Sequence, residues 1–438
     1  MYRNKINELK QWKLSTSRKP LIIRGARQVG KTWLMREFAR TEYEDFIYVN
    51  FEQEKTLRDM FKGNLYPQEL LKMLEIQYGI RPQPEKTLII FDEIQEAERG
   101  LTSLKYFCED APEYHIVAAG SLLGITLHKH VSFPVGKVNF LDLYPLTFSE
   151  FLAATGEKSL SELVQTTDFS MITAFKAKLI DCLKRYFYIG GMPEVVAKFA
   201  ENQNYMEVRN IQNFILDTYR KDFSKHAPKE IIGRIELLWN SIPSQLAKEN
   251  RKFIYANIAK GARAREYELA MAWLLDCGLI HKIHRITKVG YPLKAYQDFS
   301  VFKLYLNDVG LMSAMTNIEA KVLLEGNNMF EEFKGALTEQ FVLQQLITNK
   351  NLVINYWSAE NSKGEIDLLI QHEDQIIPIE VKATENLQAK SFKFFCEKYK
   401  PKTAIRTSLS DYRPESWMTN VPLYIIGNYF NEIKLTTL

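Results

Sequence analysis

The spacing of apolar residues along the chain differs from one region to the next. Between residues 20 and 150, short apolar runs alternate with segments whose apolar residues recur at helical spacing. The apolar runs are PLIIRG, FIYVNFE, TLIIFDE and HIVAAGS, and each is followed by turn or helix residues. Strands that alternate with helices are typical of a parallel α/β sheet. We therefore expect a parallel α/β domain in this region.

The rest of the chain changes pattern twice. Residues 1–18 predict a short amphipathic helix, and residues 150–225 predict further helices with a break at Gly190, Gly191 and Pro193. Residues 226–315 alternate helices with the β-like stretch LIHKIHRITKVGYPLKAYQD. After the helix ALTEQFVLQQLITN, strands dominate again, namely LVINYWS, EIDLLIQ, IIPIEVKA, TAIRTS and PLYIIG. This pattern predicts a second α/β domain near the C-terminus.

Composition narrows the class of protein. A chain of 438 residues is too long to fold around a single hydrophobic core, so we expect several domains. A content of 46% apolar and 25% charged residues is typical of a soluble globular protein. A net charge of +4 means that local basic patches, rather than a global field, would hold a nucleic acid. The four cysteines form no CxxC pair, which fits a reducing cytoplasm. No apolar run suits a signal peptide or a membrane span, so we expect no membrane partner.

The segment GARQVGKT, residues 25–32, has the form GxxxxGK(S/T) between an apolar strand and a helical run. That context is the one a phosphate-binding loop requires, because loop amides and the helix N-terminus face the phosphates. We expect Lys31 to reach the outer phosphates of ATP and the Thr32 hydroxyl to bind Mg²⁺. The nucleotide-binding residues expected in the loop are Gly25, Ala26, Arg27, Gln28, Val29, Gly30, Lys31 and Thr32.

An acidic pair ends the apolar run LIIFDE. We expect Asp92 to hold Mg²⁺ through water and Glu93 to polarise the attacking water. A helix N-cap would explain such a pair in isolation, but the upstream phosphate loop favours the catalytic interpretation. Ser121, at the end of YHIVAAGS, either senses the outer phosphate or caps the next helix, and the sequence leaves both open.

No arginine finger is identified by the sequence. The candidates are Lys137, Arg185 and Arg220, and an ordinary surface position explains each of them as well. A neighbouring copy of the chain could also supply the finger, so a homo-oligomer is a candidate assembly.

Several further motifs carry a family resemblance. Together with the phosphate loop, AAGSLLG, LDLYPLTFSEFL, YIGGMPEVV, FKLYLNDVGLM and YWSAENSKGEIDLLI resemble the bacterial and archaeal AAA-type ATPases that have a C-terminal DUF4143 region. The resemblance covers nearly the whole chain. It departs from the family at Gly136-Lys137, where Gly-Arg is usual, and lysine lacks the planar fork of arginine.

The resemblance implies an α/β protein with four parts. They are a P-loop AAA-type ATPase core (1–155), a helical lid (156–225), a winged-helix-like middle domain (226–325) and a restriction-endonuclease-like domain (326–438).

The middle region agrees with a winged helix. A short helix in FIYANIAKG, a turn and the longer helix ARAREYELAMAWLLDCG place Arg263 and Arg265 where a recognition helix meets the major groove. Glu266 and Glu268 dilute this basic face, so a protein-packing module with solvated charges is the alternative.

The hairpin GEIDLLIQHEDQIIPIEVKA, residues 364–383, contains three charges within apolar strands. Because side chains alternate along a strand, Asp367 can meet Glu380 and Lys382 on one face. Carboxylates bind Mg²⁺ and a neighbouring lysine stabilises developing charge, and Glu339 on the preceding helix adds a third carboxylate. This order is that of restriction-type nucleases, whereas a solvated face with a cross-strand ion pair is the alternative.

These patterns lead to two functional hypotheses. The first is a cytoplasmic Mg²⁺-dependent ATPase that couples ATP hydrolysis to DNA binding or processing, with Glu93, Lys31, Glu380 and Lys382 as catalytic residues. Its metal ligands would be Thr32 and Asp92 at one site and Glu339, Asp367 and Glu380 at the other. The second hypothesis is a nucleotide-gated interaction or signalling module whose nuclease-like domain binds without cutting.

Overall fold

Two compact units make up the chain in a computed structural model that describes residues 2–120, 133–248, 251–325, 331–359, 364–384 and 390–432. The N-terminal unit comprises Arg3–Tyr144 together with the short segment Asp276–Leu279. The C-terminal unit contains Pro145–Leu275 and Ile280–Leu438. Each unit has its own sheet, and each is described by itself below.

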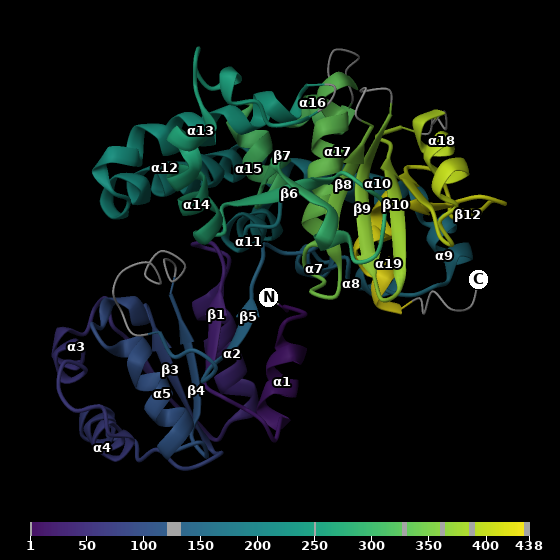
Figure 1. Ribbon diagram of the computed structural model, residues 1–438. Helices are drawn as coiled ribbons and strands as arrows, with labels where there is room; N and C mark the ends of the chain where they lie inside the picture. Colours follow the sequence, from purple (N-terminus) through teal and green to yellow (C-terminus); the bar gives the residue numbers. More distant parts are fainter. Residues whose placement is uncertain are drawn as a thin grey trace. The chain divides into compact units, whose positions relative to one another are not determined.

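The N-terminal unit contains the predicted parallel sheet, which is confirmed. Its strands pair in the order β2-β3-β4-β1-β5, and every neighbouring pair is parallel. Apolar residues fill strands β3 and β4 without alternation, because helices cover both faces of a parallel sheet. The elements of this unit, drawn in purple and blue in Figure 1, are α1 (Ile6–Leu14), β1 (Leu21–Arg24), α2 (Lys31–Glu42), β2 (Asp45–Asn50), α3 (Lys55–Met60), α4 (Pro67–Tyr78), β3 (Thr87–Asp92), α5 (Gly100–Asp110), β4 (His115–Ala119) and β5 (Asn139–Asp142).

Strand order decides which loops meet at the edge of this sheet. Since all five strands are parallel, their carboxyl ends lie along one edge, and β4 lies between β1 and β3. The loop after β1 and the end of β3 therefore face each other across the end of β4. Strand β5, which the sequence pattern did not predict, pairs with β1 from Asn139 to Asp142 and supports the loop from the other side.

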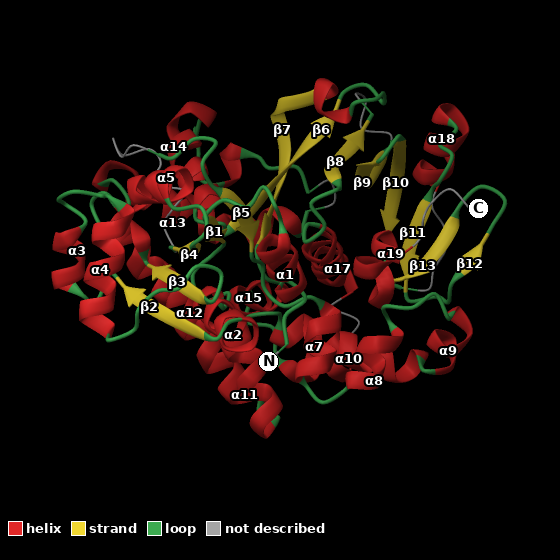
Figure 2. Ribbon diagram, turned by 90° about the horizontal axis from the view of Figure 1, so that it is seen from below, coloured by secondary structure: helices red, strands yellow, loops and turns green. Residues whose placement is uncertain are grey.

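The C-terminal unit begins with helices and then builds a mixed sheet. Eight strands pair in the order β12-β13-β11-β10-β9-β8-β6-β7, which can be followed across Figure 2. Three of the neighbouring pairs are parallel (β6 with β8, β10 with β11, β11 with β13), and the others are antiparallel. The helices are α7 (Phe148–Ala154), α8 (Lys158–Leu163), α9 (Phe169–Ala174), α10 (Lys176–Ile189), α11 (Pro193–Asn202), α12 (Tyr205–His226), α13 (Ile232–Leu246), α14 (Ala264–Asp276), α15 (Val309–Met315), α16 (Ala320–Glu325), α17 (Glu331–Leu346), α18 (Lys390–Tyr399) and α19 (Ile426–Glu432). The strands are β6 (Ile280–Ile286), β7 (Gln297–Leu306), β8 (Val353–Ser358), β9 (Glu365–His372), β10 (Gln375–Val381), β11 (Ile405–Ser408), β12 (Arg413–Pro414) and β13 (Thr419–Pro422).

The sheet crosses the boundary that we expected at residue 325. Strands β6 and β7, which the sequence placed in a middle domain, join the C-terminal sheet through the pairing of Arg285 with Tyr356. Helix α14 is followed by strand β6, which is the element order of a winged helix. The β6–β7 hairpin, however, belongs to the larger eight-stranded sheet.

One predicted strand is wrong. The run PLYIIG forms a 3₁₀ turn at Leu423–Ile425 and then α19, and the strand in this region is β13, which ends at Pro422. Proline has no N–H to donate to a ladder, so the strand ends there. Helix α19 instead packs on α17, where Gly427 approaches the Gln345 side chain.

A buried carboxylate, Asp308, ties the first helices of this unit to the sheet and to α17. Its oxygens accept hydrogen bonds from the Gly191 N–H (2.6 Å), the Leu311 N–H (3.0 Å) and the Gln344 side-chain amide (3.1 Å). A Cβ atom on Gly190 would lie 2.1 Å from Asp308 Oδ1, so only glycine fits the break predicted in YIGGMP. Burial raises the pKa of Asp308, which is fully enclosed.

We expect Asp308→Ala to destabilise the full-length chain by about 3 kcal/mol, because it leaves three buried donors without an acceptor, each worth roughly 1–3 kcal/mol. Thermal or urea unfolding measures the change. The control is Asp217→Ala, which removes an exposed carboxylate that pairs with Arg220 and should shift the midpoint little. Equal midpoints for the two variants would contradict the role of Asp308.

Candidate functional site

The predicted phosphate loop joins β1 to α2 at the carboxyl edge of the parallel sheet. A Cβ atom on Gly25 would lie 2.1 Å from the Leu143 carbonyl oxygen, so the loop needs glycine at that position. Gln28 has a φ of 66°, and Gly30 has a φ of 93° where α2 begins. These left-handed residues turn successive backbone amides toward one side, which is the arrangement that binds phosphate oxygens.

Lys31 is buried inside the loop. Its ammonium donates to the Gly25 carbonyl (2.9 Å) and to the Ala26 carbonyl (2.8 Å). Burial lowers the pKa of Lys31 to about 8, while the charges of Glu93 and Asp92 act in the opposite direction. A phosphate brought to this loop would supply negative charge and favour the protonated lysine.

Asp92 and Thr32 meet as the sequence predicted. The Thr32 hydroxyl donates to Asp92 Oδ2 at 2.6 Å, and the Tyr48 hydroxyl donates to the same oxygen at 2.8 Å. Asp92 is almost fully buried at the end of β3. A hydroxyl and a carboxylate are hard oxygen donors of the kind that Mg²⁺ prefers, so the residues present fit that ion.

Glu93 has an unusual backbone. Its φ of 49° lies in the left-handed region, which is uncommon for a residue other than glycine and often marks a functional site. Its carboxylate accepts a hydrogen bond from the Gln95 side chain at 2.6 Å. Glu93 is the N-cap residue of the short 3₁₀ helix that follows, but its side chain makes no capping hydrogen bond, so the helix-cap alternative gains no support. Ser121 lies outside the described residues.

Two residues that sequence reasoning missed also support the loop. The guanidinium of Arg3 donates to the Val29 carbonyl at 2.9 Å and to the Tyr144 carbonyl at 2.5 Å. Gly278 has a φ of 68°, and a Cβ atom there would lie 3.2 Å from the Ala26 backbone nitrogen. Neither residue belongs to a recognisable motif, so no local signal in the sequence could have found them.

The candidates for an arginine finger remain three. Lys137 forms an ion pair with Glu109 at 2.8 Å, which raises the pKa of Lys137. Arg220 pairs with Asp217 at 3.0 Å on α12, and Arg185 lies on α10.

The C-terminal hairpin brings its charged residues together. Strand β9 pairs with β10 so that Leu368 faces Ile379, and the Val381 N–H donates to Asp367 Oδ2 at 2.8 Å. Lys382 Nζ lies 2.7 Å from Glu380 Oε1. The alternation of side chains thus places Asp367, Glu380 and Lys382 as the sequence indicated.

These charges do not form a solvated face. Glu380 is only 7% exposed, and burial followed by the charge of Asp367 raises the pKa of Glu380 to about 7, although Lys382 acts against the rise. Glu339, on α17, is completely buried beside Lys303 and Tyr305 of β7. A further carboxylate, Glu365, has its pKa raised by burial.

Basic side chains surround these carboxylates, which are not arranged to coordinate a metal ion in the described part of the chain. Lys303 Nζ lies 3.0 Å from Glu339 Oε1 and 2.6 Å from Glu365 Oε1, and Arg251 contacts Glu339. Within the parts of the chain that the structure describes, no group of three or more His, Cys, Asp or Glu side chains is arranged to hold a metal ion. The carboxylates are therefore paired with protein cations as they stand.

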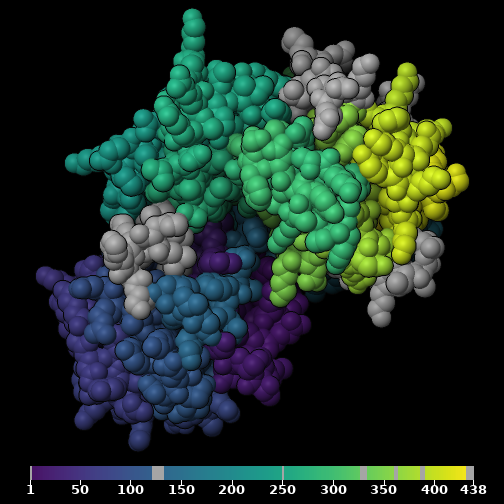
Figure 3. Space-filling model, viewed as in Figure 1, coloured from purple at the N-terminus to yellow at the C-terminus, as the bar shows by residue number. Residues whose placement is uncertain are grey.

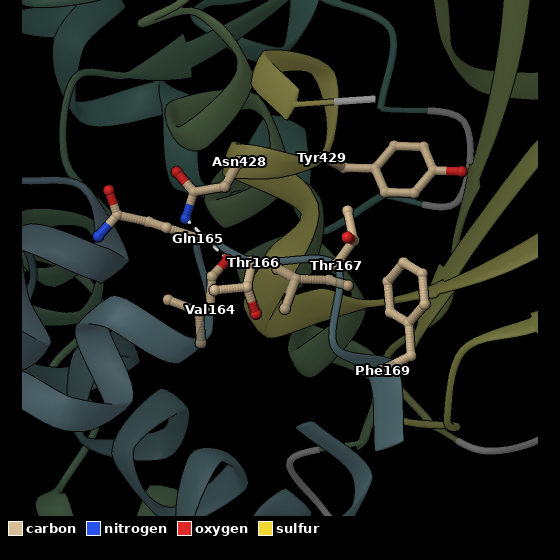
Figure 4. A pocket seen from close by; sticks show the side chains of 8 residues that line it. Val164, Gln165, Thr166, Thr167, Phe169, Asn428 and Tyr429 are labelled. Carbon is tan, nitrogen blue, oxygen red and sulfur yellow. Dashed lines mark hydrogen bonds between the residues drawn. The ribbon is translucent and has the colours of Figure 1, made fainter. Parts of the chain in front are cut away.

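Two hollows of the C-terminal unit are lined by other residues. The one in Figure 4 lies between the end of α8 and α19, where the Asn428 amide donates to the Val164 carbonyl at 3.2 Å, and its volume of about 10 Å³ holds roughly one water. A larger cavity of about 240 Å³ is bounded by residues 289–291, the β9–β10 turn and α18. On the face seen in Figure 3, green residues of this unit lie beside the yellow residues near its C-terminus.

The middle region presents Arg263 and Arg265 at the start of α14. Both are exposed, and the Glu266 carboxylate accepts the Arg263 N–H at 3.1 Å. No helix among the described residues combines the length and apolar composition needed to cross a bilayer.

The loop, the acidic strand end and the parallel sheet define a P-loop nucleotide-binding protein of the α/β class. Comparison with known families agrees. Residues 17–152 match an AAA domain, residues 180–322 match a domain of unknown function (DUF8612), and residues 334–426 match another (DUF4143). The chain thus carries an AAA-type ATPase fold followed by a C-terminal DUF4143 region.

Individual relatives are distant. An uncharacterized protein, MJ1544 of Methanocaldococcus jannaschii, is 24% identical over 362 residues, which cover 81% of this chain and 72% of that protein. Among solved structures, the Walker-type ATPase PABY2304 of Pyrococcus abyssi has 14% identity and a TM-score of 0.44, covering 72% of this chain and 95% of its own. The Aeropyrum pernix ORC1 protein in complex with DNA has 14% identity and a TM-score of 0.28, covering 73% and 93%.

We expect Gly278→Ala to weaken ATP binding at least several-fold, because the new Cβ would press on the Ala26 amide of the phosphate loop. Gly79→Ala is the matched control, since Gly79 has a φ of 67° but no atom within 4 Å of its Cβ position. Titration with a fluorescent ATP analogue measures both affinities. If the two variants bind equally well, the Gly278 contact does not shape the loop.

Proposed function

We propose that the N-terminal unit hydrolyses ATP with the help of Mg²⁺. The observation that carries this proposal is the 2.6 Å hydrogen bond between Thr32 and Asp92, which joins the phosphate loop to the acidic strand end. Bound Mg²⁺ would neutralise charge on the phosphates and stabilise their transfer. Thr32 and Asp92 would hold that ion, and Lys31 would bind the outer phosphates.

Glu93 would orient and polarise the attacking water. Its left-handed backbone, directly after Asp92, fixes the start of its side chain beside the metal-binding carboxylate. The hydrogen bond from Gln95 orients one carboxylate oxygen. A carboxylate at this point favours hydrolysis over binding of nucleotide alone.

The test of this proposal compares two variants of the full chain. We expect Lys31→Met to lose ATP binding and Glu93→Gln to bind ATP but hydrolyse it at least about 100-fold more slowly, as removal of a general base does. Phosphate release and nucleotide titration measure the two effects. Glu96→Gln, a neighbouring carboxylate 4.0 Å from Arg58, is the control and should be near wild type. Wild-type turnover by both site variants would refute the assignment.

We further propose that ATP hydrolysis is coupled to DNA binding or processing by the C-terminal unit. The grouping of Asp367 and Lys382, which are partly exposed, with the buried Glu380 and Glu339 supports a nuclease-like site, since two carboxylates and a lysine suit metal-assisted phosphodiester cleavage. Arg263 and Arg265, exposed at the start of α14, are candidate phosphate contacts.

A second candidate function is a nucleotide-gated interaction module that does not cut. The pairing of Glu339 with Arg251 and Lys303 favours it, because protein cations already occupy the oxygens of this carboxylate. In that case ATP binding would act as a switch and the C-terminal sheet as a platform for a partner.

Cleavage assays discriminate between the two candidates. Duplex, single-stranded and branched DNA are incubated with the protein and Mg²⁺ or Mn²⁺. The nuclease hypothesis predicts cleavage that is abolished by Asp367→Asn and by Lys382→Ala. Asp374→Asn, in the exposed β9–β10 turn beside Lys402, is the control and should still cut. Absence of cleavage with every substrate and ion would select the non-cutting module.

A further inference from the structure

Arg251 lies among the carboxylates of the C-terminal unit, although it is far from them in sequence. Its guanidinium contacts Glu339 Oε2, and the same nitrogen lies 3.5 Å from Asp367 Oδ1. The guanidinium therefore bridges a carboxylate of α17 and a carboxylate of β9, which are the places where a metal ion of a nuclease-like site would be held.

A second cation, Lys303, fixes the opposite side of Glu339. Its ammonium contacts Glu339 and Glu365, and the Tyr305 hydroxyl donates to Glu339 as well. The side chains of Lys303 and Glu339 are 0% exposed, whereas that of Arg251 is 20% exposed. Lys303 is thus enclosed in the core, whereas Arg251 and Lys382, whose side chain is 30% exposed, lie on the solvent side of the cluster.

The balance of charge explains why a cation is needed at this point. Four carboxylates (Glu339, Glu365, Asp367 and Glu380) are met by three cationic side chains (Arg251, Lys303 and Lys382). The carboxylates therefore already outnumber the cations, and burial of carboxylates without partners is strongly unfavourable, so removal of one cation enlarges the excess of negative charge. A divalent ion is the natural replacement, because all the donors are carboxylate oxygens.

The backbone of Arg251 is also in an unfavourable conformation. Its φ of 46° lies in the left-handed region, which a residue with a long side chain seldom adopts. Nearby, the Phe253 N–H is fixed by the Phe302 carbonyl at 2.9 Å, so the chain is anchored just beyond this point. The contact with Glu339 and Asp367 therefore offsets a local cost that release of Arg251 would relieve.

We propose that Arg251 is a built-in cation that holds Glu339 and Asp367 together in place of a divalent metal ion, so that Arg251 and the metal exclude each other. Metal-dependent chemistry at this cluster then requires Arg251 to leave, which makes the arginine an autoinhibitory contact. The inference rests on the proposed assignment of these carboxylates as a cation site, and it does not depend on ATP hydrolysis.

The test measures Mn²⁺ binding by the full-length chain in the absence of nucleotide. Calorimetry gives the affinity, and thermal unfolding with MnCl₂ or with EDTA gives the change in stability. We expect Arg251→Met to bind Mn²⁺ at least roughly tenfold more tightly than wild type and to gain thermal stability with the ion, because binding to the native state stabilises it. The double variant Arg251→Met with Asp367→Asn should lose this gain. Arg251→Lys, which keeps the charge, should show none or little of it.

The control is Arg413→Met, which removes a half-exposed arginine paired with Glu415 at 2.6 Å and should leave Mn²⁺ affinity unchanged. The proposal is overturned if wild type binds Mn²⁺ as tightly as Arg251→Met, if the Asp367→Asn double variant keeps the gain, or if Arg251→Met stays unfolded at every MnCl₂ concentration. Gain of Mn²⁺ affinity without any DNA cleavage would reject the nuclease proposal alone and leave the role of Arg251 intact.

Discussion

The arrangement of the C-terminal unit depends on the need to satisfy the buried carboxylate of Asp308. Its hydrogen bonds join the Gly190-Gly191 turn, the start of α15 and Gln344 of α17. Gln344 in turn accepts the Val309 N–H at 2.8 Å. Because Glu339 lies on the same helix as Gln344, the network that fixes α17 also fixes the position of the carboxylate cluster. A structural constraint in the helical part thereby sets the geometry of a candidate site on the sheet.

The two candidate sites bury charge in opposite ways. At the phosphate loop, Lys31 is held by backbone carbonyls and its pKa is lowered to about 8, so an incoming phosphate would supply the missing counter-charge. At the carboxylate cluster, Lys303 and Arg251 already neutralise Glu339. The two groups of residues therefore differ in charge: the loop encloses a cation, whereas the cluster pairs its carboxylates with protein cations.

Much of the N-terminal fold could be predicted because its signals are local. Four of the five parallel strands follow from apolar runs, and the loop of residues 25–32 follows from spacing within one turn. Strand β5 escaped prediction because its burial pattern is mixed, with Phe140 exposed. The strand predicted for PLYIIG was wrong because apolar residues alone do not distinguish a strand from a buried helix. Here the segment forms a helix that packs against α17.

The phosphate loop, the acidic pair after β3, and the shared face of Asp367, Glu380 and Lys382 can be located from the amino-acid order alone, because each follows from a short spacing or from the two-residue period of a strand. The residues that complete these groups are set by the fold. Arg3 reaches Val29 across 26 positions, and Arg251 reaches Asp367 across 116. Such partners are set by the packing of distant elements, and the energetic requirement that buried charges and polar groups be paired selects them.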